Sequence, residues 1–210
     1  MMEKIIVLAT RNAGKIAELE KTLSEYGLTV KGLDAYPEIG EIVEDGVTFE
    51  ENSLIKARTV AQLTGHVAVA DDSGLEVDVL DKAPGVYSAR YSDDTPNLKG
   101  ETRDKRNNEK LLMELSAIPH EKRTARFRCV MSACAPSGEC ITASGAWEGF
   151  IGTEEVGDNG FGYDPLFIDA ADGSVSALLS REAKNARSHR GNALAALLSQ
   201  WDDFWKEHGK

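Results

Sequence analysis

An apolar run that ends in two adjacent carboxylates constrains the fold of this chain more than any other feature. Residues 67–70 read Val-Ala-Val-Ala, and Asp71 and Asp72, a serine and a glycine follow directly. The chain then alternates apolar and acidic residues over positions 75–79, which is the period of a β-strand. We therefore expect two extended segments of a sheet, with the acidic pair at the break between them.

The acidic pair has two interpretations. Neighbouring carboxylates at the end of a strand can hold a divalent cation and polarise a water molecule. The alternative is a plain turn, in which an Asp or Ser side chain caps a backbone group and the glycine supplies a positive φ. The pair alone does not decide between them, so other segments of the chain must.

Length and composition are those of one globular domain, which we expect to span residues 1–210. The chain has 41% hydrophobic and 28% charged residues, ordinary values for a globular protein. No apolar run approaches the roughly 20 residues of a membrane helix. Because Met1 leads almost at once into a short strand, we also expect no signal peptide and a cytoplasmic location.

The net charge of −11 argues against nucleic acid as a partner, since nucleic-acid-binding surfaces carry basic patches. It leaves room for a small anionic ligand, which needs only a local group of cations. The three cysteines, Cys129, Cys134 and Cys140, are spaced neither like a disulfide framework nor like a zinc site. We expect them to be buried thiols.

A strand, a polar turn and a helix open the chain. Residues 4–9 are apolar, residues 10–15 read Thr-Arg-Asn-Ala-Gly-Lys, and a helical stripe follows from Ile16 to Tyr26. Such a turn directs free backbone N–H groups to the space above the strand end. Lys15 lies near the helix N-terminus, where a positive charge is unfavourable. A bound anion would remove that conflict, and a solvated lysine is the alternative.

A second helix begins with the capping-box pattern of Thr48 and Glu51. On this helix Asn52 and Lys56 share a narrow stripe with apolar residues. If that stripe faces the core, a buried lysine needs a partner. The alternative is that the neighbouring face, which carries Leu54, Ala57 and Ala61, turns inward.

The remaining elements predict a mixed sheet. Residues 100–115 have the pattern of a charged helix, and residues 125–133 and 140–147 have that of an antiparallel hairpin. In the first half of the chain helices link the strands, and a hairpin follows later. This combination indicates an α/β fold whose sheet has both parallel and antiparallel strands.

Two further segments are candidates for ligand binding. Residues 157–165 alternate glycines with aromatic and acidic residues, so the backbone can approach a ligand and an exposed ring can stack on a nucleobase. The alternative is a glycine-rich turn whose rings fill the core. Residues 184–191 lead into the last helix, with Ser188 as its N-cap. His189 and Arg190 then lie in a first turn that favours negative charge, which favours an electronegative ligand. The alternative is a histidine that is only packed or solvated.

Six motifs together resemble the inosine triphosphate pyrophosphatase family, also called Ham1-like. They occur in order across nearly the whole chain, at residues 10–15 (Thr-Arg-Asn-Ala-Gly-Lys), 49–57 (Phe-Glu-Glu-Asn-Ser-Leu-Ile-Lys-Ala), 70–75 (Ala-Asp-Asp-Ser-Gly-Leu), 84–90 (Pro-Gly-Val-Tyr-Ser-Ala-Arg), 160–165 (Gly-Phe-Gly-Tyr-Asp-Pro) and 188–191 (Ser-His-Arg-Gly). The chain departs from the family at Ser53, usually Ala, at Ala183, often Glu, and at Arg187, commonly a hydrophobic residue.

The resemblance implies an α/β fold with an elongated mixed β-sheet, flanking helices and two lobes around a central cleft. It also implies a homodimer and Mg²⁺-dependent hydrolysis of ITP, dITP and XTP to the monophosphate and pyrophosphate. Such a reaction clears deaminated purines from the nucleotide pool.

The same resemblance implies roles for individual residues. Asp72 is the expected catalytic base, with Lys56 as a second catalytic residue, and Asp72 and Glu44 are the expected Mg²⁺ ligands. The expected substrate-binding residues are Thr10, Arg11, Asn12, Ala13, Gly14, Lys15, Ser73, Phe161, Gly162, Tyr163, Asp164, Lys184, His189 and Arg190. Two rival hypotheses remain open: a Maf-like enzyme acting on modified pyrimidine nucleotides, and a nucleotide-binding regulator without turnover.

Overall fold

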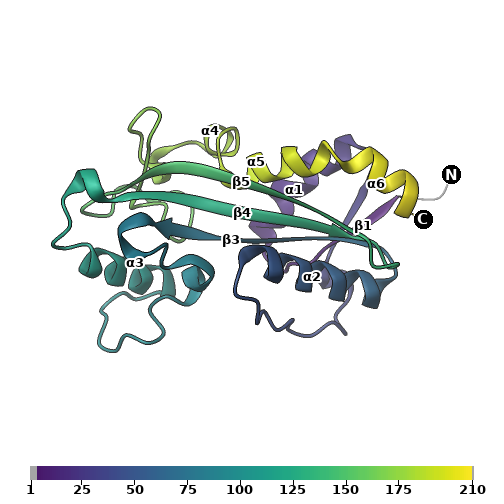
Figure 1. Ribbon diagram of the computed structural model, residues 1–210, viewed down its shortest axis with the longest axis horizontal. Coiled ribbons are helices and arrows are strands. Elements are labelled where there is room, and N and C mark those ends of the chain that lie inside the picture. Colours follow the sequence, from purple (N-terminus) through teal and green to yellow (C-terminus); the bar gives the residue numbers. More distant parts are fainter. Residues whose placement is uncertain (1–3, 210) are drawn as a thin grey trace. The chain divides into compact units, whose positions relative to one another are not determined.

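The computed structural model describes residues 4–209, apart from the side chains of residues 13, 14, 18, 21 and 25. A six-stranded sheet runs through it in the order β2-β1-β3-β4-β5-β6 (Figure 1). The strands are β1 (Ile5–Leu8), β2 (Thr29–Gly32), β3 (Val67–Val77), β4 (Thr124–Cys134), β5 (Cys140–Ile151) and β6 (Phe167–Asp169). Because β1 pairs in parallel with β2 and β3 while β5 pairs antiparallel with β6, the sheet is mixed, as predicted.

Six α-helices accompany the sheet within the described residues. They are α1 (Ala13–Glu25), α2 (Phe49–Thr64), α3 (Arg103–Glu114), α4 (Arg181–Asn185), α5 (His189–Leu198) and α6 (Trp201–His208). The capping box expected at the start of α2 is present, since Thr48 accepts from the backbone of Glu51 and the Glu51 side chain accepts from the backbone of Thr48. Gly65 ends α2 with a left-handed backbone, a conformation that costs glycine little.

The chain divides into two compact units, and each contains non-contiguous stretches. Unit 1 comprises residues 1–72, 130–144 and 193–210, and unit 2 comprises residues 73–129 and 145–192. The boundaries fall inside β3, β4, β5 and α5. The single domain over residues 1–210 and the central cleft both stay predictions.

Unit 1 has its core where α2 packs on the strands. Val60 and Ala61 of α2 are fully buried together with Val7 of β1 and Ala68 of β3. In Figure 1, α2 lies on the opposite side of these strands from α1 and α6. The first half of β3 is therefore covered on both faces, which explains its uninterrupted apolar run.

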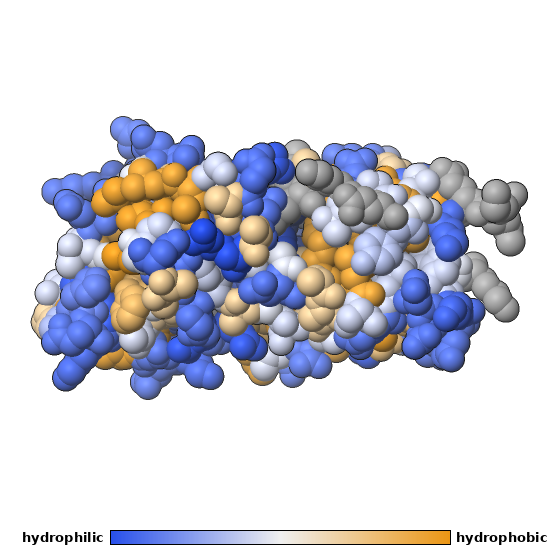
Figure 2. Space-filling view, turned by 90° about the horizontal axis from the view of Figure 1, so that it is seen from above, coloured by the Kyte–Doolittle hydropathy of each residue, from blue (hydrophilic) through white to orange (hydrophobic). Residues whose placement is uncertain are grey.

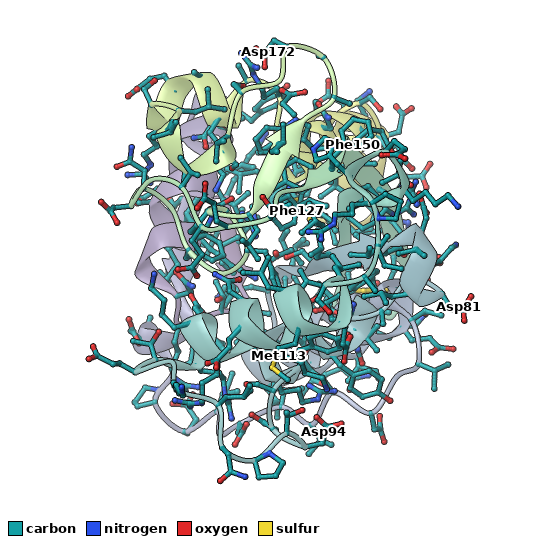
Figure 3. All side chains as sticks on the ribbon, turned by 90° about the vertical axis from the view of Figure 1, so that its left-hand side faces the viewer. Asp81, Asp94, Met113, Phe127, Phe150 and Asp172 are labelled. Atoms are coloured by element: carbon teal, nitrogen blue, oxygen red, sulfur yellow. A yellow bond between two sulfur atoms is a disulfide. The ribbon has the colours of Figure 1, made fainter. Side chains whose placement is uncertain are left out.

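Unit 2 has a second core with a larger aromatic content. Its buried residues include Phe127 of β4, Trp147 of β5 and Phe167 of β6, whose rings contact one another. Figure 3 shows Phe127 enclosed by other side chains. Leu111 of α3 and Leu115, which directly follows it, are fully buried in this core.

Three sequence expectations about these elements are wrong. The acidic pair does not interrupt the strand, because β3 continues from Val67 to Val77 without a break. The last helix is two helices, α5 and α6, separated at residues 199–200. Tyr26 follows α1 instead of lying on it, and 45% of the residue is exposed.

The cysteine expectation is also wrong for two of the three residues. Cys134 and Cys140 form a disulfide across the β4–β5 turn, with their Cα atoms 4.2 Å apart. They are six positions apart in the sequence, and the hairpin places them opposite each other. Cys129 keeps its thiol and is buried, as expected.

Polar residues cover much of the face shown in Figure 2, with smaller apolar patches among them. Among residues 4–209, no helix combines the length and the apolar character that a membrane span requires.

Gly149→Ala is expected to lower the free energy of unfolding by about 2–3 kcal/mol, because the core of unit 2 has no room for the added methyl group. Its Cβ would lie 2.3 Å from the carbonyl oxygen of Ile168 and 2.5 Å from the buried ring of Phe167. Equilibrium denaturation measures the loss. Gly152→Ala is the control, since its Cβ meets no atom closer than 3.5 Å. Equal stability of the two variants would contradict this packing.

Candidate active site

The turn between β1 and α1 brings one group of predicted residues to a pocket of unit 1. Asn12 closes this turn, since its side-chain oxygen accepts from the backbone N–H of Lys15 at 3.2 Å. Arg11 donates to the carbonyl oxygen of Ile39 and so joins the turn to the loop that precedes α2. The predicted site residues that line this pocket are Thr10, Arg11, Lys15, Glu44 and Lys56. The side chains of the predicted residues Ala13 and Gly14 lie outside the described ones.

Lys15 has a partner within the protein. Its ammonium group lies 3.0 and 2.9 Å from the two carboxylate oxygens of Asp71, and the Asp71 side chain is 3% exposed. The positive charge near the start of α1 is thus offset by a buried carboxylate, so the structure does not require a bound anion to explain it. Asp71, whose role the sequence left open, positions Lys15 at the pocket.

The two carboxylates of the acidic pair serve different neighbours. Successive side chains of a strand point to opposite faces of the sheet. Asp71 accordingly meets Lys15 of α1, while the carboxylate of Asp72 lies 3.5 Å from the ammonium group of Lys56 on α2. Continuity of β3 therefore separates the two acids more firmly than a turn would.

Lys56 is held between two carboxylates. Its ammonium group donates to Glu44 at 2.7 Å and lies 3.5 Å from Asp72. Burial lowers the pKa of Lys56, but the carboxylates of Asp72 and Glu44 outweigh burial and raise it above its ordinary value. Lys56 is therefore a firmly charged group beside Asp72.

For Asp72, burial has a larger effect on the pKa than the neighbouring cation does. Burial raises its pKa, the nearby charges of Glu44 and Asp71 raise it further, and Lys56 and Asn52 offset only part of this effect. Asn52 donates to Asp72 at 3.2 Å and accepts from the backbone N–H of Gly46 at 2.9 Å. The raised pKa brings Asp72 closer to the range in which a carboxylate accepts a proton effectively.

Residues of both predicted faces of α2 are buried. Asn52 and Lys56 are buried, and so are Ala57 and Ala61 of the neighbouring face. Leu63, near the C-terminus of the same helix, is 63% exposed. The sequence pattern indicated that Asn52 is a polar residue on a stripe with apolar ones. It did not indicate that Asn52 donates a hydrogen bond to Asp72.

The carboxylates of Glu44 and Asp72 are a suitable set for Mg²⁺. This ion is usually held by one or two protein carboxylates together with waters and phosphate oxygens. The described residues contain no cluster of three or more His, Cys, Asp or Glu side chains able to hold a metal by themselves. Burial and the nearby charge of Glu44 raise the pKa of Asp72, and a cation held by both carboxylates would reduce their repulsion, so this donor set fits Mg²⁺.

A second pocket belongs to unit 2 and has an aromatic wall. The predicted residues that line it are Ser73, Phe161, Gly162, Tyr163, Asp164, Lys184, His189 and Arg190. The ring of Phe161 is the exposed member, with 56% of the residue accessible. The ammonium group of Lys184 lies 5.2 Å and the guanidinium carbon of Arg190 lies 6.0 Å from its ring centre. An accessible ring with cations close to it suits a planar, electron-rich ligand.

Asp164 and Tyr163 line this pocket and also hold its walls. One oxygen of Asp164 accepts from the Ser176 hydroxyl at 2.7 Å, and the other accepts from the Phe161 backbone and from Lys184. The Tyr163 hydroxyl donates to the carbonyl oxygen of Ser88, and burial raises the pKa of Tyr163. Both residues therefore fix the shape of the pocket through buried hydrogen bonds.

The start of α5 supplies the other wall. Ser188 caps this helix as predicted, because its hydroxyl accepts from the backbone N–H of Gly191 at 3.1 Å. The ring of His189 stacks on Phe127, with centres 5.0 Å apart, and Arg190 donates to the hydroxyl of Ser73 at 3.3 Å. Phe127 was not predicted as a site residue, since its strand pattern indicates core packing alone.

Comparison with known proteins relates the chain to one family. The model of the Ham1 family matches residues 6–200. The chain is 67% identical to the dITP/XTP pyrophosphatase of Nitratidesulfovibrio vulgaris, an alignment covering 98% of this chain and 100% of the relative. It is 50% identical to the dITP/XTP pyrophosphatase of Geobacter sulfurreducens over 91% of this chain and 94% of the relative.

Solved structures agree with the sequence relatives. A HAM1 protein from Coxiella burnetii superposes with a TM-score of 0.85 at 37% identity, covering 96% of this chain and 100% of the other. A structure described as a nucleoside-triphosphatase and dITP/XTP pyrophosphatase from Mycobacterium abscessus gives a TM-score of 0.75 at 45% identity. The match covers 92% of this chain and 98% of the other.

Asp72→Asn is expected to raise the thermal unfolding midpoint near pH 7. Because the pKa of Asp72 is raised in the folded chain, its ionised form costs stability, and the amide removes that cost. The cost is full above the folded pKa and absent below the ordinary value of 3.8, so the gain should vanish as the pH falls to that value.

Asp78→Asn is the matched control with the opposite sign. Hydrogen bonds from Arg126 and Thr124 lower the pKa of Asp78, so its ionised form stabilises the fold. That contribution is present above 3.8 and is lost as the pH falls through the lowered pKa. Thermal unfolding at several pH values measures both variants, and a midpoint lowered by both at pH 7 would contradict the assignment for Asp72.

Proposed function

The chain belongs to the Ham1 family, and we propose that it hydrolyses ITP, dITP and XTP to the monophosphate and pyrophosphate. The observation that carries the proposal is the centre formed in unit 1 by Asp72, Lys56 and Glu44, where a carboxylate of raised pKa adjoins a charged lysine. Phosphoanhydride hydrolysis needs a group that accepts a proton from water and cations that offset phosphate charge. The dITP/XTP pyrophosphatases among its relatives support the substrate class.

We assign the triphosphate to the unit 1 pocket. The residues that line it include Thr10, Arg11 and Lys15 from the start of α1, and Lys56 from α2. Two ammonium groups and one guanidinium group there can donate hydrogen bonds to the phosphate oxygens. Asp71 holds Lys15 by both oxygens, so that the lysine is placed before the nucleotide arrives.

Asp72 is the proposed general base. A water oxygen attacks the α-phosphorus while Asp72 takes a proton from that water, and the bond from the α-phosphorus to the bridging oxygen breaks as pyrophosphate leaves. Asn52 orients the Asp72 carboxylate through the hydrogen bond at 3.2 Å. Lys56 offsets the negative charge that builds up on the phosphate oxygens during the displacement.

Glu44 and Asp72 are the proposed Mg²⁺ ligands. When bound, the ion lowers the pKa of coordinated water and offsets charge on the phosphates. The same ion would reduce the repulsion between these two carboxylates.

We assign the base to the unit 2 pocket. Phe161 offers an exposed ring for stacking, and His189 and Arg190 line the same pocket as hydrogen-bond donors. A 6-oxo group on the base would accept from such donors, whereas a 6-amino group would leave buried donors unpaired. The homodimer and the cytoplasmic location that the sequence predicts stay predictions.

A panel of ITP, XTP, ATP and GTP with Mg²⁺, followed by identification of the products, tests the reaction. The expected products from ITP and XTP are the monophosphate and pyrophosphate, formed much faster than from ATP. Orthophosphate as the first product, or equal rates on ATP, would contradict the proposal. Turnover of modified pyrimidine nucleotides instead would favour a Maf-like enzyme, and tight ITP binding without turnover would favour a regulator.

The same assay tests Asp72 and Lys56. Asp72→Asn is expected to abolish turnover although it is expected to unfold at a higher temperature, which separates chemistry from folding. Lys56→Met is expected to lower kcat by about 10²–10³-fold, the usual effect of removing one charge-stabilising group. Lys206→Met is the control, because its side chain is 74% exposed on α6. Full activity of Asp72→Asn would remove Asp72 from the mechanism.

Removal of divalent cations with EDTA is expected to stop turnover, and added Mg²⁺ to restore it. Glu44→Gln should raise the Mg²⁺ concentration for half-maximal rate by about 10–100-fold, the range found for losses at metal sites. Glu38→Gln is the control, since Glu38 is an exposed carboxylate of the same loop. An unchanged Mg²⁺ requirement in Glu44→Gln would remove Glu44 from the ligand set.

A further inference from the structure

Arg187 joins the segment between α4 and α5 to the end of β6 and to the turn that follows it. One nitrogen of its guanidinium group lies 2.9 Å from a carboxylate oxygen of Asp169 and 2.7 Å from one of Asp172. All three residues belong to unit 2. Their contacts connect two chain segments that are otherwise 15 or more positions apart.

Both carboxylates are oriented by their own turn. The second oxygen of Asp169 accepts from the backbone N–H of Ala171 at 2.8 Å. The second oxygen of Asp172 accepts from the backbone and the hydroxyl of Ser174. These hydrogen bonds orient each carboxylate independently of Arg187. The two acceptors are therefore already in place for the arginine side chain.

The two contacts differ in expected strength. The Asp169 side chain is 4% exposed, and a buried carboxylate that loses its cation leaves an uncompensated charge. The Asp172 side chain is 48% exposed, and Figure 3 shows Asp172 at the outer side of its loop. Ion pairs of exposed groups contribute little. The contact with Asp169 therefore contributes most to holding Arg187 in place, and the contact with Asp172 helps to orient its guanidinium group.

Arg187 is placed between the residues that we assign to the base. Lys184 lies three positions before it in α4, and His189 and Arg190 lie two and three positions after it in α5. The backbone N–H of Arg187 donates to the carbonyl oxygen of Lys184 at 3.2 Å. A displacement of Arg187 would thus move the chain on both sides of it, and small displacements of binding groups are costly.

We propose that Arg187 is a positioning residue that fixes the α4–α5 junction through Asp169 and thereby sets the affinity for the base end of the nucleotide. This inference rests on the proposed function, because it takes the unit 2 pocket as the base site. Arg187 itself is not among the residues that line that pocket. It acts through Lys184, His189 and Arg190.

The test compares Arg187→Leu, Arg187→Lys and Arg126→Leu. Arg126 is the matched control, because it also bridges two carboxylates of unit 2, Asp78 and Glu148, and does not line the pocket. Four quantities are measured for each variant: the KM and kcat for ITP, the Kd for inosine monophosphate by calorimetry, and the thermal midpoint.

Arg187→Leu is expected to raise the KM for ITP and the Kd for inosine monophosphate by about tenfold, with kcat changed by less than about threefold. Tenfold corresponds to about 1.4 kcal/mol. Arg187→Lys should give intermediate values, since an ammonium group keeps the charge but lacks the planar fork. Arg126→Leu should leave KM and Kd unchanged.

Three outcomes overturn the inference. Arg187→Leu could lose thermal stability with an unchanged KM and Kd, which would make the contact purely structural. Arg126→Leu could raise KM and Kd equally, which would make the effect unspecific. If Arg187→Leu does not fold, a wild-type Kd and KM in Arg187→Lys overturns it.

The wild-type protein separates this inference from the proposed function. If it binds inosine monophosphate but releases no pyrophosphate from ITP, the proposed reaction is wrong, and the Kd comparison still decides the role of Arg187. If it neither binds the monophosphate nor hydrolyses ITP, both are wrong.

Discussion

Two successive carboxylates in one continuous strand point to opposite faces of the sheet, and the centre of unit 1 depends on this alternation. Asp71 and Asp72 of β3 each find a lysine, but on different helices, Lys15 on α1 and Lys56 on α2. A bend at this point would have placed both acids in one region, where they would compete for the same cations. The unbroken strand lets Asp71 hold Lys15, which we assign to the phosphates, while Asp72 on the other face is the proposed general base.

The arrangement around Asp72 carries an electrostatic cost. Glu44, Asp71 and Asp72 are three carboxylates near two ammonium groups, and burial adds to the cost of keeping Asp72 ionised. Such an arrangement contributes less to folding than a neutral core would, and perturbed groups of this kind gather at functional sites. Its cost is borne by the surrounding packing, including the fully buried residues Val60 and Ala61 of α2. The site is thus prepared for ligands that bring positive charge, as a metal does, or that use the lysines.

Much of the fold could be predicted from local patterns, because caps, turns and periodicity act over a few residues. The capping box at Thr48 and the hairpin around residues 136–139 are examples. The position of the acidic pair could not, since aspartates are disfavoured in strand interiors and their partners Lys15 and Lys56 come from distant segments. The disulfide of Cys134 and Cys140 depends in the same way on the hairpin register. For the site, the motifs indicated the pocket residues, whereas the support from Asn52, Phe127 and Asp169 became visible with the tertiary contacts.

The division of each unit into separate stretches of chain has a consequence for biosynthesis. Unit 2 is complete once residue 192 has been made, but unit 1 still lacks residues 193–210, which include Trp201 and Phe204 of α6, both buried. On the ribosome, every residue of unit 2 therefore emerges while the core of unit 1 is unfinished. Assembly of unit 1 brings residues 193–210 together with residues 1–72, a connection of high contact order that slows folding. The lysine and carboxylate pairs of the pocket therefore belong to a unit whose buried residues include some that follow all of unit 2 in the sequence.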